Sequence, residues 1–84
     1  MKRRERRVSL IIGSLRNDPG ILEEFLARSQ FDCAARCRSH LECQGANFRL
    51  PEGGSNQGTC RLYPTASDGT DLSSDPKWDY MAND

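Results

Sequence analysis

The fold is decided by the stretch DCAARCRSHLECQGANF, residues 32–48, together with TCRLY, residues 59–63. These segments hold all four cysteines of the chain, spaced Cys33-x3-Cys37-x5-Cys43-x16-Cys60. The first two cysteines are four residues apart, which places both sulfurs on one face of a helix. The last two each adjoin a stretch of strand character. A helix that offers two thiols to neighbouring strands predicts a small α+β domain stapled by disulfides, and this plan favours a binding domain over an enzyme.

The helix has a clear start signal. Ser29 is followed three residues later by Asp32, which matches a capping box with Asp in place of the usual Glu. We therefore expect a helix over residues 30–39, with both of its cysteines on the buried stripe. Arg36 and Arg38 lie outside that stripe.

The sequence predicts four short strands around this helix, at residues 8–12, 44–50, 59–63 and 77–81. The second of them alternates between apolar and polar side chains and is expected to be half-buried, with Ala46, Phe48 and Leu50 facing inward. In the last, Trp78 and Tyr80 share one face.

Residues 21–27 fit either a short strand or a helical turn, and Leu22, Phe25 and Leu26 are expected to form their buried side. Polar loops are expected at residues 51–58 and 64–76, where Gly, Ser and Asp are frequent.

The length of 84 residues predicts one domain, which we place at residues 8–81 after a basic lead-in at residues 1–7. A chain of this size buries only roughly 60–65% of its unfolded surface, so disulfides or a metal often supplement the core. The net charge is zero, which argues against a nucleic-acid partner. No stretch approaches the ~20 apolar residues of a membrane span, so membrane insertion is not expected.

The basic lead-in followed by the apolar residues 8–15 imitates a signal peptide. Ser9, Gly13 and Ser14 interrupt the apolar part, and no small-residue cleavage site follows. A strand is therefore the favoured interpretation of this segment, and the chain is then expected to be a piece of a longer secreted protein.

These residues together resemble the PAN/apple family. The resemblance rests on Cys33-Ala34-Ala35-Arg36-Cys37, then CQGANF from position 43, then CRLY from position 60, and an aromatic strand around Trp78. It covers about residues 8–81 and implies one helix cradled on a twisted antiparallel sheet in an extracellular, non-catalytic binding module. Many apple domains carry a third disulfide that joins the terminal strands, and this chain has no cysteines for it.

Four cysteines permit three pairings. A bond between Cys33 and Cys37 would constrain almost nothing, because it would join consecutive helical turns. The resemblance implies Cys33–Cys60 and Cys37–Cys43, each tying the helix to a strand. A zinc site is the competing use of four thiols, but structural zinc sites usually present C-x2-C knuckles on tight turns. We therefore expect neither a metal nor another cofactor.

The resemblance also suggests a ligand site. In the hepatocyte growth factor module of this family, the arginine before the second helix cysteine contributes to binding heparin-like glycans, and Arg36 stands at that position. Arg38 and the basic lead-in could extend such a patch, because sulfates favour clustered guanidinium groups. Residues 36 and 38 nevertheless point roughly 200° apart on a helix, so they cannot form one tight fork.

A protein contact is the other expected function, with the 51–58 loop or an exposed edge of the last strand as the contact surface. Catalysis has little support in the sequence. His40 is the only histidine and lies near the expected end of the helix, while Ser29 is better explained as a cap than as a nucleophile.

Overall fold

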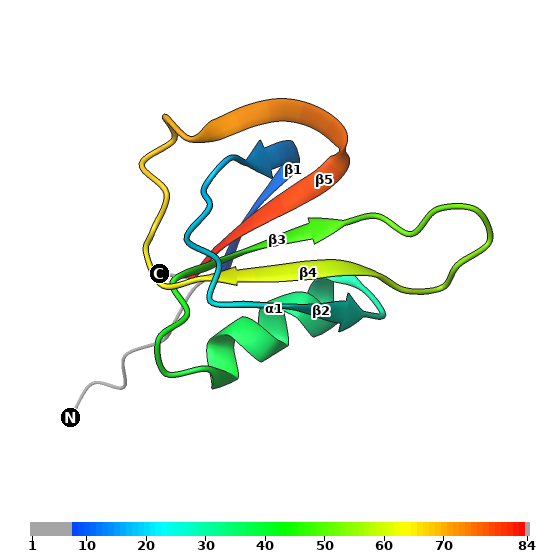
Figure 1. Ribbon diagram of the computed structural model, residues 1–84, viewed down its shortest axis with the longest axis horizontal. Helices are drawn as coiled ribbons and strands as arrows, with labels where there is room; N and C mark the ends of the chain where they lie inside the picture. Colours follow the sequence, from blue (N-terminus) through cyan, green and yellow to red (C-terminus); the bar gives the residue numbers. More distant parts are fainter. Residues whose placement is uncertain (1–7, 84) are drawn as a thin grey trace.

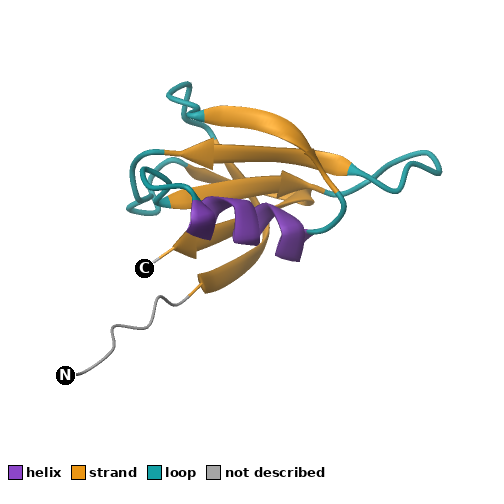
Figure 2. Ribbon diagram, turned by 90° about the horizontal axis from the view of Figure 1, so that it is seen from below, coloured by secondary structure: helices purple, strands orange, loops and turns teal. Residues whose placement is uncertain are grey.

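One helix packs on one face of an antiparallel sheet in the computed structural model, which describes residues 8–83 (Figure 1). The helix is α1 (Gln30–Ser39). The five strands, in sheet order, are β1 (Val8–Arg16), β5 (Leu72–Asn83), β3 (Gly45–Arg49), β4 (Gly58–Tyr63) and β2 (Glu23–Ala27). Figure 2, seen from below, shows that α1 crosses a single face of this sheet. The predicted class, α+β with one helix on a twisted antiparallel sheet, is confirmed.

Helix α1 begins where its capping signal predicts. The Ser29 hydroxyl accepts a hydrogen bond from the backbone N–H of Asp32 at 3.1 Å, which satisfies one of the free amides of the first turn. The Asp32 carboxylate in turn accepts from the backbone N–H of Arg28, also at 3.1 Å. These two bonds fix the angle at which the chain enters the helix from β2.

Two disulfides hold α1 in place. Cys33 is bonded to Cys60 of β4, and Cys37 is bonded to Cys43, which lies in the turn just before β3 rather than in a strand. This is the pairing that the family resemblance implies. Both helix cysteines are buried, so the bonds lie inside the core rather than at its edge.

The core lies between α1 and the sheet. Its buried members come from the helix, from all three central strands and from β2, and Leu22, Phe25 and Ala34 pack against them. They are Ala27, Cys33, Cys37, Cys43, Ala46, Phe48, Cys60, Leu62 and Met81. Along β3 and β4 every second side chain belongs to this core, so these side chains all point to the sheet face that the helix covers.

The opposite face of β3 is also covered, so the prediction of a half-buried strand is wrong. The register of β1 against β5 breaks after Ile12, and Gly13 adopts a φ of +72°, which bends the two strands. Figure 1 shows the first part of β5 arching over the sheet beside the end of β1. The side chain of Asn47, fully buried on that face, accepts from the backbone N–H of Arg16 at 2.7 Å and donates to the carbonyl of Ser14 at 3.0 Å.

The strands differ from the predictions mainly at their ends. β1 and β5 are longer than expected, and residues 72–76, predicted as loop, belong to β5. Within residues 21–27, which fitted either a strand or a helical turn, the last five form strand β2. Leu26 was expected to be buried but is exposed, because it alternates with Phe25, which faces the helix. Leu50 is also exposed, since β3 ends at Arg49.

The last strand was expected to offer an edge, and this is wrong. β5 lies between β1 and β3, so the edges of the sheet are β1 and β2. Trp78 and Tyr80 are buried, and they share one strand face as predicted. Among residues 8–83, no helix is long and apolar enough to cross a membrane. The basic lead-in lies outside the described residues.

Candidate functional site

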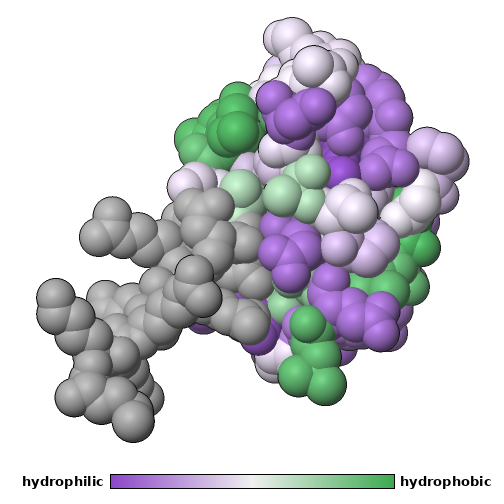
Figure 3. Space-filling model, turned by 90° about the vertical axis from the view of Figure 1, so that its left-hand side faces the viewer, coloured by the Kyte–Doolittle hydropathy of each residue, from purple (hydrophilic) through white to green (hydrophobic). Residues whose placement is uncertain are grey.

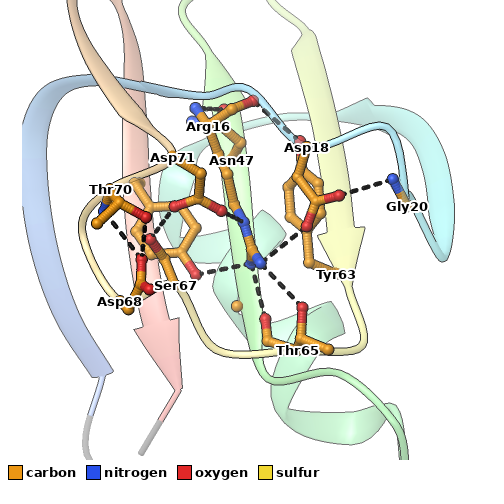
Figure 4. A network of polar contacts seen from close by, with 12 residues as sticks. Arg16, Asp18, Gly20, Asn47, Tyr63, Thr65, Ser67, Asp68, Thr70 and Asp71 are labelled. Carbon is orange, nitrogen blue, oxygen red and sulfur yellow. Dashed lines mark hydrogen bonds and ion pairs between the residues drawn. The ribbon is translucent and has the colours of Figure 1, made fainter.

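A dense cluster of polar contacts surrounds Arg16 (Figure 4), a residue that the sequence did not single out. Its side chain is buried, and its guanidinium lies 4.4 Å from the centre of the Tyr63 ring. Nε donates to the carboxylate of Asp71 at 2.8 Å, and Nη2 donates to the carboxylate of Asp18 at 3.0 Å. Nη1 donates to the carbonyl of Thr65 at 2.7 Å, and Nη2 donates to the Thr65 hydroxyl at 2.9 Å.

The Arg16 cluster is structural. Nη1 also donates to the Tyr80 hydroxyl at 3.1 Å, so all five guanidinium N–H groups have partners within the chain. Burial alone would lower the pKa of Arg16, but the hydrogen bond to Asp71 and the neighbouring charges raise it above its usual value. The guanidinium holds the 64–71 loop and the turn at residues 17–20 against the sheet, and no N–H group is left for a ligand.

No sequence signal could have identified Arg16. Its partners Thr65, Asp71 and Tyr80 lie 49, 55 and 64 residues away in the chain. A lone arginine at the end of a strand is indistinguishable from a solvated surface charge until the tertiary structure brings those groups to it.

The arginine that the resemblance singled out, Arg36, lies beside a hollow on the β2 side of α1. The hollow has a volume of about 250 Å³ and is lined by Glu23, Phe25, Arg36, Ser39 and His40. The Arg36 guanidinium is 5.0 Å from the centre of the Phe25 ring, and its Nε is 4.0 Å from the Asp32 carboxylate. The Arg36 side chain is 59% exposed, so it is open to a ligand. We call this hollow the Arg36 hollow.

His40 closes one end of the Arg36 hollow. Its Nδ1 accepts a hydrogen bond from the backbone N–H of Glu42 at 3.1 Å, and its Nε2 lies 3.7 Å from the carboxylate of Glu23. Ser39 is not paired with His40 as an activated nucleophile, because the Ser39 hydroxyl donates to two carbonyls of its own helix at 3.1 and 3.2 Å. The arrangement can bind a polar group, but it assembles no acid–base pair with a nucleophile.

Arg38 lies on the other side of α1. It lines a separate hollow with Leu10 of β1 and Met81 of β5. The structure therefore does not bring Arg36 and Arg38 together, as the 200° separation on a helix requires. A single two-arginine clamp on this helix is excluded by that geometry.

The 51–58 loop projects from the end of the sheet that lies away from both termini (Figure 1). Glu52 anchors its base, with a carboxylate 2.9 Å from an Arg49 nitrogen and 3.7 Å from Nζ of Lys77. At the opposite end of the molecule, Figure 3 shows hydrophobic side chains in separate groups among hydrophilic ones. Outside the grey atoms, that end presents no continuous apolar patch.

The comparison with known families gives one result. The PAN domain family matches residues 11–84, which is most of the chain. No curated protein and no solved structure matches this chain. The match covers both disulfides, the helix and strands β2 to β5 in full, and β1 from Ile11 onward. The chain therefore belongs to the PAN domain family.

Proposed function

We propose that this PAN domain is a non-catalytic binding module of a longer extracellular protein, and that it binds a protein partner through the Arg36 hollow. PAN domains are typically protein- or carbohydrate-binding modules and are generally non-catalytic. The family and the two disulfides fit an extracellular location, where disulfides persist.

The observation that carries the proposal is the mixed lining of the Arg36 hollow on a rigid support. Arg36 and His40 can donate hydrogen bonds, Glu23 can accept them, and Phe25 provides an apolar floor. One disulfide ties helix α1 to β4 and the other ties it to the turn before β3, so these groups are held in place before a ligand arrives. Such a combination suits a polypeptide, which offers carbonyls, amides and apolar side chains together.

A sulfated glycan is the second candidate, favoured by the exposure of the Arg36 guanidinium. Asp32 and Glu23 oppose it, because the Asp32 carboxylate lies 4.0 Å from Nε of Arg36 and Glu23 lines the same hollow, so both would repel sulfate groups. The zero net charge of the chain also disfavours a polyanion. We therefore rank the protein partner first.

A heparin column and a glycan array separate the two candidates. A glycan ligand predicts retention that weakens steeply with salt, and Arg36→Glu should reduce it more than Arg49→Glu does, because Arg49 lies on β3 and pairs with Glu52. For a protein partner, a photo-crosslinking side chain at position 39 should capture one extracellular protein, and Arg36→Glu should abolish that product. If neither the column, the array nor the crosslinker shows binding that depends on Arg36, the proposed site is wrong.

A further inference from the structure

The sheet has two free edges, and they differ in charge. Among residues 8–83, β1 pairs only with β5 and β2 pairs only with β4. A free edge exposes a row of backbone N–H and C=O groups with which another strand can pair, and proteins usually block such pairing with charged side chains. β2 carries two exposed glutamates, Glu23 and Glu24, among its five residues. Residues 8–15 of β1 contain no charged side chain, so the β1 edge is the unblocked one.

The exposure of side chains along β1 indicates a missing strand. Leu10, Ile11 and Ile12 are consecutive, and they are 43%, 41% and 76% exposed. Leu10 is paired with Met81 of the core, so it points to the sheet face that α1 covers, and Ile11 points to the other face. A partner that docked on one face of the sheet would cover only alternate residues. A strand added beside β1 would cover side chains on both faces.

The exposed aromatic side chain of α1 is less specific about its partner. Phe31 is 76% exposed and lies between two hollows, one beside Leu10 and the other beside Leu50. That surface offers side-chain area without a row of backbone groups, so it does not define what would cover it. The β1 edge defines its partner, because free backbone groups along a strand are satisfied by another β-strand.

The part of β1 that can pair is short and has a defined centre. The register between β1 and β5 breaks after Ile12, and Gly13 has a φ of +72°, so the strand bends there. A regular edge is therefore left at residues 8–12, and Leu10 is its middle residue. Antiparallel pairing about that centre would place Leu10 opposite Leu10 of a second copy. No charged side chain would lie within the paired stretch, so the pairing brings no like charges together.

We propose that two copies of this chain associate through their β1 edges, antiparallel and centred on Leu10, so that two five-stranded sheets form one continuous sheet. The contact is isologous, with a twofold axis perpendicular to the sheet, and it therefore places both helices on the same face. Pairing of β1 with β2 of a second copy fits less well. It would set Glu23 and Glu24 beside apolar side chains, and because the two edges differ it would continue into an open filament.

The dimer should be weak and should leave the Arg36 hollow free. Residues 8–12 of each copy are far fewer than the roughly 20–30 residues a side of a stable interface, so we expect a dissociation constant of about 0.1 mM. The Arg36 hollow lies against β2, at the opposite edge of the sheet from β1. A dimer would therefore present two Arg36 hollows at once, and a clustered partner would be held more tightly than by one copy.

The test is the mass of the full chain in solution. Sedimentation equilibrium from about 10 µM to about 1 mM should show the average mass rising from one copy toward two, because the expected dissociation constant lies within that range. Over the same range, the backbone amide shifts of residues 9–12 in a ¹H–¹⁵N spectrum should change, and those of Glu23–Ala27 on the other edge should not.

Charges placed at the proposed axis make the test specific. Leu10→Lys alone and Leu10→Glu alone should each stay monomeric, because like charges would lie directly opposite each other across the axis. An equimolar mixture of these two variants should dimerise again, since the pairing then joins opposite charges. Ile12→Lys should also stay monomeric, and this change should leave the fold intact because the Ile12 side chain is 76% exposed.

The matched control is Leu26→Lys, because Leu26 is 61% exposed on the other edge strand, β2. This variant should dimerise like the parent, and so should Arg36→Glu, which changes only the Arg36 hollow. The proposal is overturned if the parent is monomeric at about 1 mM, or if Ile12→Lys associates as strongly as Leu26→Lys. An average mass above two copies would also overturn it, because it would indicate filaments rather than a closed dimer.

Discussion

The guanidinium of Arg61 on β4 lies 4.6 Å from the centre of the Trp78 ring on β5, across the intervening strand β3 and on the sheet face opposite α1. A carboxylate oxygen of Glu24 on β2 lies 3.3 Å from Nε of the same arginine. Trp78 therefore closes a surface that the helix does not cover, and its ring joins two strands that are not neighbours.

Truncation of this ring tests the role of the last strand. Trp78 is buried, so Trp78→Ala should lower the free energy of unfolding by about 3–5 kcal/mol, which approaches the whole stability of a small domain. Arg61→Ala should cost only about 1 kcal/mol, because it removes the cation–π contact and leaves the ring buried by its other neighbours. Urea denaturation measures both. Equal stabilities of Trp78→Ala and the parent would mean that β5 is not part of the core.

The two disulfides should contribute unequally to the free energy of unfolding. The Cys33–Cys60 bond spans 27 residues and the Cys37–Cys43 bond spans 6, so loop-closure entropy predicts about 3–4 kcal/mol for the first and roughly 2 kcal/mol for the second. Removing Cys37 and Cys43 together should lower the thermal midpoint but leave a folded domain. Removing the other pair should be more damaging. Peptide mapping that found a Cys33–Cys37 bond, or free thiols in the folded protein, would contradict this assignment.

Acid should weaken the attachment of the 64–71 loop. The hydrogen bond from the Ser67 hydroxyl, and after it the Arg16 guanidinium, holds the pKa of Asp71 below its ordinary value. The stabilisation from such a group is complete above the unfolded pKa of about 4 and is lost as pH falls through the lower folded pKa. The thermal midpoint should therefore decline below about pH 4.

Two substitutions check this dependence. Asp71→Asn should be less stable than the parent at neutral pH. Its thermal midpoint should fall less in acid, because the carboxylate that titrates there has been removed. Ser67→Ala should make the decline smaller and end it at a higher pH, since it removes the largest cause of the lowered pKa of Asp71 and so brings the folded pKa closer to the unfolded one. Asp68, whose pKa the Thr70 hydroxyl lowers, is present in every variant and contributes the same background. Parallel pH curves for Asp71→Asn and the parent would show that this carboxylate is not responsible.

Gly58 should tolerate no side chain. A Cβ at this position would lie 1.9 Å from the backbone oxygen of Arg49 and 2.8 Å from the ring of Phe48. The nearest clash is with backbone rather than with a flexible side chain, and Gly58 is itself paired with Ala27 of β2, so Gly58→Ala should destabilise the domain by about 1–3 kcal/mol or more. Gly20→Ala is the control, because its nearest neighbour is the flexible side chain of Asp18 at 3.2 Å. Denaturation curves that overlap for the two variants would show that the β3–β4 pairing is looser than the structure indicates.

The candidate site could be predicted only in part. Arg36 and Arg38 were identified from the sequence, and helical geometry alone required them to point apart. Phe31 was read from the sequence only as part of the capping stretch, although it lies about 200° from Cys33 on the helix and therefore off the buried face. The hollows beside Phe31 could not be predicted, because their linings include Leu10 and Leu50, which are distant in the chain.

By itself, the sequence determined the features that depend on neighbours a few residues away. Ser29 and Asp32 set the start of α1, and the four-residue spacing of Cys33 and Cys37 set its buried face, because these interactions form within one or two helical turns. Only the tertiary structure decided that β1 and β5 bend over the second face of β3 and bury Asn47 and Arg16. Those groups are satisfied by partners tens of residues away, so the same side chains could have been solvated in another arrangement of the same strands.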